Sequence, residues 1–220
     1  MRLMIAALFL LSLVFCMQQT KHSGFTKAKQ ITSRDELIAG PKAKGEIGDF
    51  LLANDKIRVL IQNKGFSRDA GFFGGSILDV DLVREKNIGH DNFAELFPSF
   101  FLGIPKPEEI TILQKGSNGE NLDESDKNRA VILISGGISD FLNSSSIINS
   151  LVFNFSDLEF ESEISILPSE NFITITTRLY NIGNTAIDIP LTSSYNGFEL
   201  PAPLGDVLLF GEGNHLFAPG

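Results

Sequence analysis

Two neighbouring segments limit the fold most, because both alternate between apolar and polar side chains over most of their length. Residues 158–167 place aliphatic and aromatic side chains on one face and glutamates with serine on the other, and residues 172–180 repeat the pattern. The segment 168–171 between them predicts a turn, and residues 181–184 predict a second turn before a third strand over residues 186–191. Such alternation is typical of antiparallel strands that are buried on one face and solvated on the other.

Earlier parts of the chain carry strand signals of the same kind. Asn54-Asp55 lies between two apolar runs, is typical of a tight turn, and predicts a hairpin. Residues 116–129 are polar and mostly acidic, and we interpret them as the solvated tip of a second hairpin. The predicted strands cover residues 50–53, 56–62, 76–83, 109–114 and 130–135.

Helical signals are few. Residues 32–38 predict one short turn with a capping pattern at its start. Residues 93–101 are expected to begin as a helix that Pro98 limits, and residues 143–150 predict another turn. The sequence therefore predicts an all-β fold, an antiparallel β-sandwich with a few short helical turns.

The amino terminus resembles a bacterial lipoprotein signal. Arg2 precedes an unbroken apolar run that is shorter than the ~20 residues needed to span a bilayer. The run ends at Cys16, with Leu13 at the expected third position before it and Phe15 where such signals usually carry a small residue. The resemblance implies diacylation of the Cys16 thiol, and an uncleaved anchor is the alternative.

This interpretation divides the chain into three parts. Residues 1–15 are the expected signal peptide, residues 16–30 the lipidated cysteine and a flexible polar tether, and residues 31–220 the β-sandwich domain. We therefore expect an exported protein of the cell envelope, held on a membrane by its lipid, since more than one acyl chain gives stable anchoring.

Composition excludes several classes of function. The net charge of −9 argues against nucleic-acid binding, which needs a clustered positive surface. A single cysteine excludes a disulfide framework and any cysteine-based metal site. The partners that remain are the membrane and an envelope protein or a carbohydrate.

Residues 45–97 resemble the amino-terminal β-domain of a group of exported bacterial proteins, many of them predicted lipoproteins. The matching elements are Gly48-Asp49, the Asn54-Asp55 turn, Gly74-Gly75 ahead of Asp79, and residues 90–97. The resemblance implies relatives that continue past the position of Gly220 into a metallohydrolase domain, so one interpretation is a sandwich truncated at its C-terminal end. The same elements are similar to the galactose-mutarotase-like supersandwich, in which a sheet face binds a sugar.

For neither resemblance does the chain contain a motif that would supply the corresponding catalytic site. A metallohydrolase site needs converging histidines, but the chain has only His22, His90 and His215, and no HxH or HExxH motif. A mutarotase needs a base and an acid, for which His90 with Asp91 and Glu95, or His215 with Glu212, are the candidates. We predict no metal, no cofactor and no catalytic residue.

Carboxylates on one predicted strand are weak ligand-binding candidates. Asp79 and Asp81 alternate with apolar residues and so share a face, and with His90 and Asp91 they form the candidate set. Calcium is one interpretation, because hard cations take oxygen ligands, and a solvated sheet face is the other. The glycines of residues 71–75 predict a turn with close backbone approach.

Phenylalanine is in excess, with 19 Phe against 2 Tyr and no Trp. Most should fill the core, but Phe72-Phe73 and residues 97–101 are candidates for exposed partner sites. We therefore predict a lipid-anchored, non-catalytic β-sandwich that binds or scaffolds in the cell envelope. A truncated module of a metallohydrolase-type protein and a mutarotase-like sugar-binding protein are the alternatives.

Overall fold

The computed structural model describes residues 24–84, 89–99, 103–117, 128–140, 155–186, 192–195, 198–201, 206–211 and 214–219. The predicted signal segment, Cys16 and the first part of the predicted tether lie outside the described residues, so lipidation stays a prediction. The predicted turn at 143–150 and most of the strand at 186–191 also lie outside them. Within the described residues, no helix is long and apolar enough to cross a membrane.

Strands form nearly all the regular structure, which confirms the all-β prediction. The strands are β1 (Thr26–Gln30), β2 (Phe50–Asn54), β3 (Ile57–Ile61), β4 (Ile77–Leu82), β5 (Glu95–Ser99), β6 (Gly103–Lys115), β7 (Ala130–Asp140), β8 (Leu158–Ile166), β9 (Thr174–Asn181), β10 (Thr192–Tyr195), β11 (Phe198–Pro201), β12 (Asp206–Gly211) and β13 (Asn214–Pro219). Two 3-10 turns are described, η1 (Arg34–Glu36) and η2 (Phe155–Asp157). The first of them lies where the sequence predicts a short turn.

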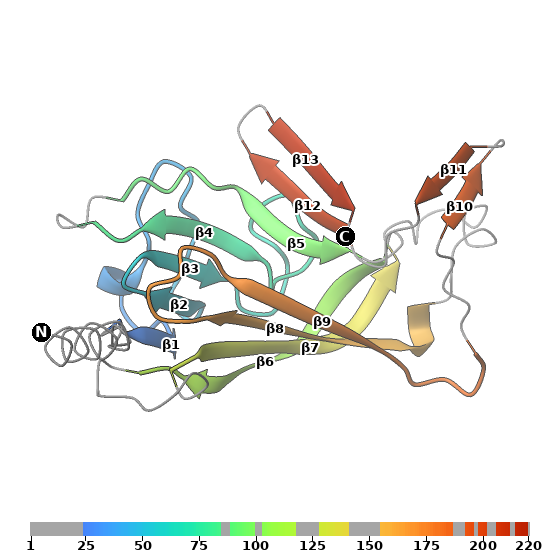
Figure 1. The fold of residues 1–220 in the computed structure, drawn as a ribbon, viewed down its shortest axis with the longest axis horizontal. Coiled ribbons are helices and arrows are strands. Elements are labelled where there is room, and N and C mark those ends of the chain that lie inside the picture. The colour runs from blue at the N-terminus through green and yellow to red at the C-terminus, as the bar shows by residue number, and fades with distance from the viewer. Residues whose placement is uncertain are drawn as a thin grey trace, which may run out of the picture.

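Antiparallel pairing arranges the strands in two large sheets and one hairpin (Figure 1). The seven-stranded sheet has the order β1-β2-β3-β4-β5-β12-β13, and the four-stranded sheet has the order β6-β7-β8-β9. β10 and β11 pair with each other. The predicted hairpins β2–β3, β6–β7 and β8–β9 are all present in the structure.

One apolar core joins the two large sheets into a sandwich. Side chains of β1 to β4 meet those of β7 and β8 in this core, with Leu52, Ile61, Ile132 and Phe160 almost fully buried. A second, smaller cluster buries the other face of β2 to β4 under Ile31 and neighbouring residues. Because β2 is buried on both faces, its sequence is a continuous apolar run and not an alternating one.

Asn54 ends β2 and holds the two sheets together. Its side-chain oxygen accepts hydrogen bonds from the backbone N–H groups of Lys56 (2.8 Å) and Ile57 (2.9 Å), which forms the predicted turn. Its side-chain nitrogen donates to the carbonyls of Leu167 and Glu170, both at 2.8 Å, in the turn between β8 and β9. The amide is fully buried, so one side chain connects two sheets at their shared end.

The ordered domain begins earlier than predicted. Residues 26–30 were expected to belong to the tether, but they form β1 and pair with β2 from Thr26↔Asn54 to Gln30↔Phe50. Thr26 and Ala28 are buried, whereas Lys27 is half-buried. This short two-residue alternation is too brief to stand out from a polar segment. Its lysines are typical of an edge strand.

The helix expected at residues 93–101 is wrong, because residues 95–99 form β5. Glu95 and Phe97 are buried while Leu96 and Pro98 are half-buried, so the segment follows the two-residue period of a strand. Pairing with β4 on one side and β12 on the other fixes this conformation. The long-range partner, β12, could not be inferred from the local sequence.

Candidate functional site

Asp79, the first predicted ligand residue, is fully buried on β4. Its two carboxylate oxygens accept hydrogen bonds from the backbone N–H groups of Lys44 and Gly45, each at 2.8 Å. Burial, together with the nearby charges of Asp91 and Asp49, raises the pKa of Asp79 to about 6 against the lowering effect of these hydrogen bonds. Asp79 therefore fastens a loop to the sheet.

Asp81 and Asp91 have the same kind of role. Asp81 accepts from the N–H groups of His90 (3.0 Å) and Leu82 (2.8 Å) and forms an ion pair with Arg84. Burial favours a higher pKa for Asp81, but these contacts outweigh it and lower the pKa. One oxygen of Asp91 accepts from the N–H groups of Val80 (3.0 Å) and Phe93 (3.2 Å), and burial raises its pKa.

These contacts revise the two interpretations of the aspartates. Asp79 and Asp81 are buried, so the solvated sheet face is wrong. Over the described ranges, no group of three or more His, Cys, Asp or Glu side chains could hold a metal ion. The carboxylate oxygens of Asp79, Asp81 and Asp91 accept from backbone N–H groups, except for the buried Oδ2 of Asp91, which has no partner among the described residues. Ligand binding by this set stays a prediction that its contacts do not support.

The histidine candidates come no closer to a catalytic arrangement. His90 is exposed in the loop after β4 and lines neither of the two cavities described below, while Glu95 is fully buried. His215 lies on β13, whose side chains are outside the described part of the structure, and Glu212 is itself outside the described residues. No described residue pair therefore presents a histidine and a carboxylate to a common cavity.

A different surface stands out, on the loop between β3 and β4. Phe66 is 85% exposed and Phe72 is 47% exposed. Phe66 and Phe73 form an isolated bridge across the loop, so their backbones run side by side. Lys106 of β6 lies with its ammonium 5.8 Å from the centre of the Phe73 ring. Lys64 lines a surface groove together with Phe66, Phe73 and Lys106. We call Lys64, Phe66, Phe72, Phe73 and Lys106 the aromatic–lysine face.

Buried polar side chains hold this loop in place from below. Glu95 of β5 accepts hydrogen bonds from the Ser67 hydroxyl (2.7 Å) and the Gly71 N–H (2.6 Å). Gln62 donates to the Phe66 carbonyl at 2.6 Å. Arg68 forms ion pairs with Glu46 and with the buried Asp49. The loop that carries the exposed phenylalanines is therefore tied to the sheet at several points.

The predicted glycine turn is confirmed at Gly74-Gly75. A Cβ on Gly74 would lie 1.9 Å from the Asn63 carbonyl oxygen, and Gly75 has φ +78° with Pro107 of β6 2.5 Å from a Cβ built on it. Only glycine fits both the close approach and the left-handed backbone. These two residues bring the loop back into β4 and seat it against the facing sheet.

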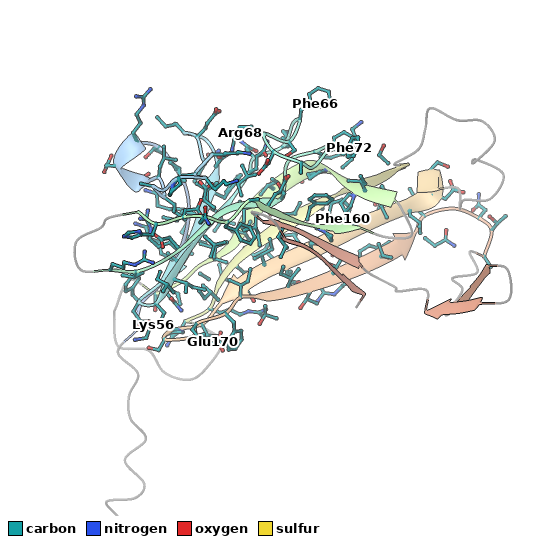
Figure 2. The ribbon with its side chains drawn as sticks, turned by 90° about the horizontal axis from the view of Figure 1, so that it is seen from above. Lys56, Phe66, Arg68, Phe72, Phe160 and Glu170 are labelled. Carbon is teal, nitrogen blue, oxygen red and sulfur yellow. The ribbon has the colours of Figure 1, made fainter. Side chains whose placement is uncertain are left out.

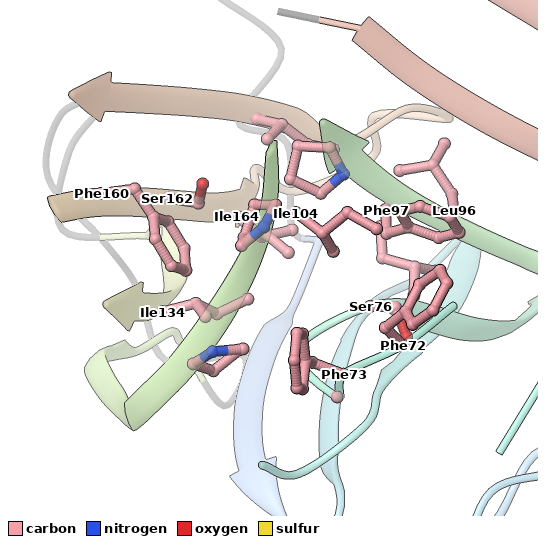
Figure 3. Close-up of a pocket in the computed structure, with 17 residues that line it drawn as sticks. Phe72, Phe73, Ser76, Leu96, Phe97, Ile104, Ile134, Phe160, Ser162 and Ile164 are labelled. Carbon is pink, nitrogen blue, oxygen red and sulfur yellow. The ribbon is translucent and has the colours of Figure 1, made fainter. Parts of the chain in front are cut away.

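Behind the aromatic–lysine face lies a narrow apolar cavity between the two sheets (Figure 3). Phe160 and Ile164 of β8 line it on one side and Phe97 of β5 on the other. An outer groove of about 290 Å³ adjoins it, lined by Lys64, Gly65, Phe66, Phe73, Lys106 and Pro107. Phe73 and Pro107 line both spaces, so the groove and the cavity lie on opposite sides of these two residues.

Sequence reasoning found part of this surface. Phe72-Phe73 was expected as an exposed partner site, and Phe72 is exposed while Phe73 is half-buried. The same expectation for Phe97 is wrong, because only 6% of it is exposed, and residues 100–101 are outside the described part. Phe66 and the two lysines were missed. A phenylalanine next to Gly65 in a loop between two strands was the available signal.

The chain was compared with family models, curated proteins and solved structures, and none of them matches it.

Proposed function

We propose that this chain is a lipid-anchored, non-catalytic binding module of the cell envelope, and that the aromatic–lysine face is its binding surface. The exposed Phe66 on a firmly held loop is the observation that supports this most. Water-exposed aromatic rings are unfavourable, and a patch of them on a soluble domain commonly marks an interaction site. Binding surfaces are often loops positioned by a rigid scaffold, as this one is.

The position of the face fits an anchored module. Gly24 lies beside the Asn54-Asp55 turn, since a Cβ on it would be 2.8 Å from the Ser169 hydroxyl and 3.0 Å from Asp55. The loop with Phe66 lies at the other end of β2 and β3, about 17 Å away for a five-residue strand. Figure 2 shows Phe66 and Phe72 on the edge opposite Lys56 and Glu170. The chain enters at one end of the sandwich and exposes the face at the other.

The anchor is tested with Cys16→Ser. Acyl chains contribute ~0.8 kcal/mol per buried methylene. The acylated protein with Cys16 should therefore remain in the membrane fraction, and the Cys16→Ser variant should leave it. Intact mass of the detergent-extracted protein gives the matching readout, residues 16–220 plus acyl groups. A mass that retains Met1, or a variant that stays in the membrane, contradicts the lipid anchor.

The binding surface is tested in cells with a photo-crosslinking amino acid at Phe66. Phe172 provides the control position, because it is also exposed (55%) but lies in the turn between β8 and β9, near the chain entry. We expect a discrete crosslinked species from position 66 that does not form from position 172. Equal crosslinking from both positions, or none from position 66, contradicts the proposed surface.

A further inference from the structure

We infer that the ligand of the aromatic–lysine face is a single anionic amphiphile, whose head lies between Lys64 and Lys106 and whose alkyl tail lies in the outer groove against Phe66 and Phe73. This inference rests on the proposed binding role of the face and adds the chemical class of the ligand. Three features carry it, namely the side chains that line the groove, the charge of its two lysines and its volume.

The groove is suited to hydrocarbon. Its lining is Gly65, Phe66, Phe73 and Pro107 with the two lysines, so it presents no hydroxyl or amide side chain to a ligand. A sugar would find few side-chain partners for its hydroxyl groups here. An alkyl chain with one charged group fits better.

The groove carries two positively charged side chains, Lys64 and Lys106, in a chain whose net charge is −9. The Lys64 ammonium donates a hydrogen bond to the Glu108 carbonyl at 3.2 Å, and the Lys106 ammonium lies over the Phe73 ring. Neither lysine forms an ion pair with a carboxylate of the described residues, whereas nearby Arg68 is paired with Asp49. The acidic residue closest in sequence to Lys106 is Glu108, which is exposed and is not ion-paired with either lysine in the described part of the chain. Two ammonium groups without an ion pair beside an apolar groove favour an anion with an apolar tail.

The groove, at about 290 Å³, is the space that can hold a tail, because the cavity behind Phe73 has only about 20 Å³ and the described side chains nearly fill it. Each methylene that leaves water in the groove contributes up to ~0.8 kcal/mol. Affinity should consequently rise by up to threefold to fourfold per methylene until the groove is filled.

The test uses the domain from residue 24 and the full chain, with a dansyl-labelled undecanoate as the fluorescent probe. Octanoate, dodecanoate, dodecyl phosphate and dodecanol compete with it, each below its critical micelle concentration. We expect displacement that increases from octanoate to dodecanoate and is stronger for the two twelve-carbon anions than for dodecanol. The double variant Lys64→Gln/Lys106→Gln should lose about tenfold in affinity for dodecanoate and little for dodecanol.

Lys115→Gln is the matched control, since Lys115 is an exposed lysine at the far end of β6 from Lys106. It should bind dodecanoate like the unmodified chain. Equal loss in Lys115→Gln and in the double variant, or no binding of any alkyl anion up to millimolar concentration, overturns the inference. Binding to anionic phospholipid vesicles without binding of dodecanoate also overturns it, in favour of a membrane surface. Crosslinking from Phe66 would persist in each of these cases, so the proposed function is judged separately.

Discussion

Replacing Asn54 by alanine should destabilise the domain more than any other single change at the turn end of the sandwich. The side chain makes four hydrogen bonds, two within its own hairpin and two to the turn between β8 and β9. A hydrogen bond contributes a net ~1 kcal/mol, and a buried group left without a partner costs ~1–3 kcal/mol. The half-buried Leu167 and Glu170 carbonyls regain some water, so we expect a total loss of about 3 kcal/mol.

Urea unfolding at pH 7 measures this loss, and it corresponds to a decrease in Tm of roughly 6–12 °C for a domain of this size. Asn54→Asp separates the two halves of the interaction. Aspartate keeps the acceptor for Lys56 and Ile57 but loses the donor to Leu167 and Glu170, so it should lose about 2 kcal/mol. The control is Asn171→Ala, because Asn171 is an exposed asparagine in the turn between β8 and β9. This substitution should change stability by less than ~0.5 kcal/mol.

A loss below about 1 kcal/mol for Asn54→Ala would refute the reasoning, because four buried hydrogen bonds could not then be intact. A small effect of Asn54→Asp beside a large effect of Asn54→Ala would be equally informative. It would mean that the amide forms the hairpin turn but does not hold the two sheets together.

Two further changes test the buried Asp79 and the glycine turn beside the aromatic–lysine face. The pKa of Asp79 is higher in the folded protein (about 6) than its ordinary 3.8, so its stabilising contribution is complete below about pH 4 and is lost as the pH rises through 6. Between pH 4.5 and 7.5 the unsubstituted chain should lose ~2 kcal/mol that Asp79→Asn does not lose, and parallel urea-derived curves would contradict this. Gly74→Ala should cost more than ~2 kcal/mol, because its Cβ meets the Asn63 carbonyl, whereas Gly137→Ala, with nothing within 4 Å, should be near neutral by thermal unfolding.

The strands were predictable where one strand face is buried and the other is wet. In β8 the buried residues fall on alternate positions from Leu158 to Ile164, so the sequence period and the structure agree there. The β6–β7 and β2–β3 hairpins were predictable for a different reason, because turn residues separate two apolar runs. β1 and β5 were not, since both depend on a partner strand that is distant in sequence: β1 pairs with β2 and β5 with β12.

The candidate site was harder to predict, because the roles of polar residues depend on distant backbone. Asp79 is an unremarkable strand aspartate in the sequence, but its partners are the N–H groups of Lys44 and Gly45, 35 and 34 residues away. Asp91 accepts a hydrogen bond from the N–H of Val80, 11 residues away. Carboxylates that pair with backbone N–H groups in this way have the same sequence signature as ligand-binding carboxylates. Only their partners distinguish the two roles.

The buried carboxylates and the exposed phenylalanines belong to one arrangement. Glu95 and Asp49 hold the loop from residue 63 to residue 76 through Ser67, Gly71 and Arg68. A loop supported in this way can keep aromatic rings in water without collapsing onto the core, and a rigid surface loses less entropy when it binds. Loosening the support should therefore weaken binding even though no supporting residue touches the ligand. Glu95→Gln tests this, because it should raise amide exchange in the loop and reduce dodecanoate affinity while the far hairpin β8–β9 exchanges as before. Unchanged loop exchange with normal affinity would show that Glu95 does not organise the face.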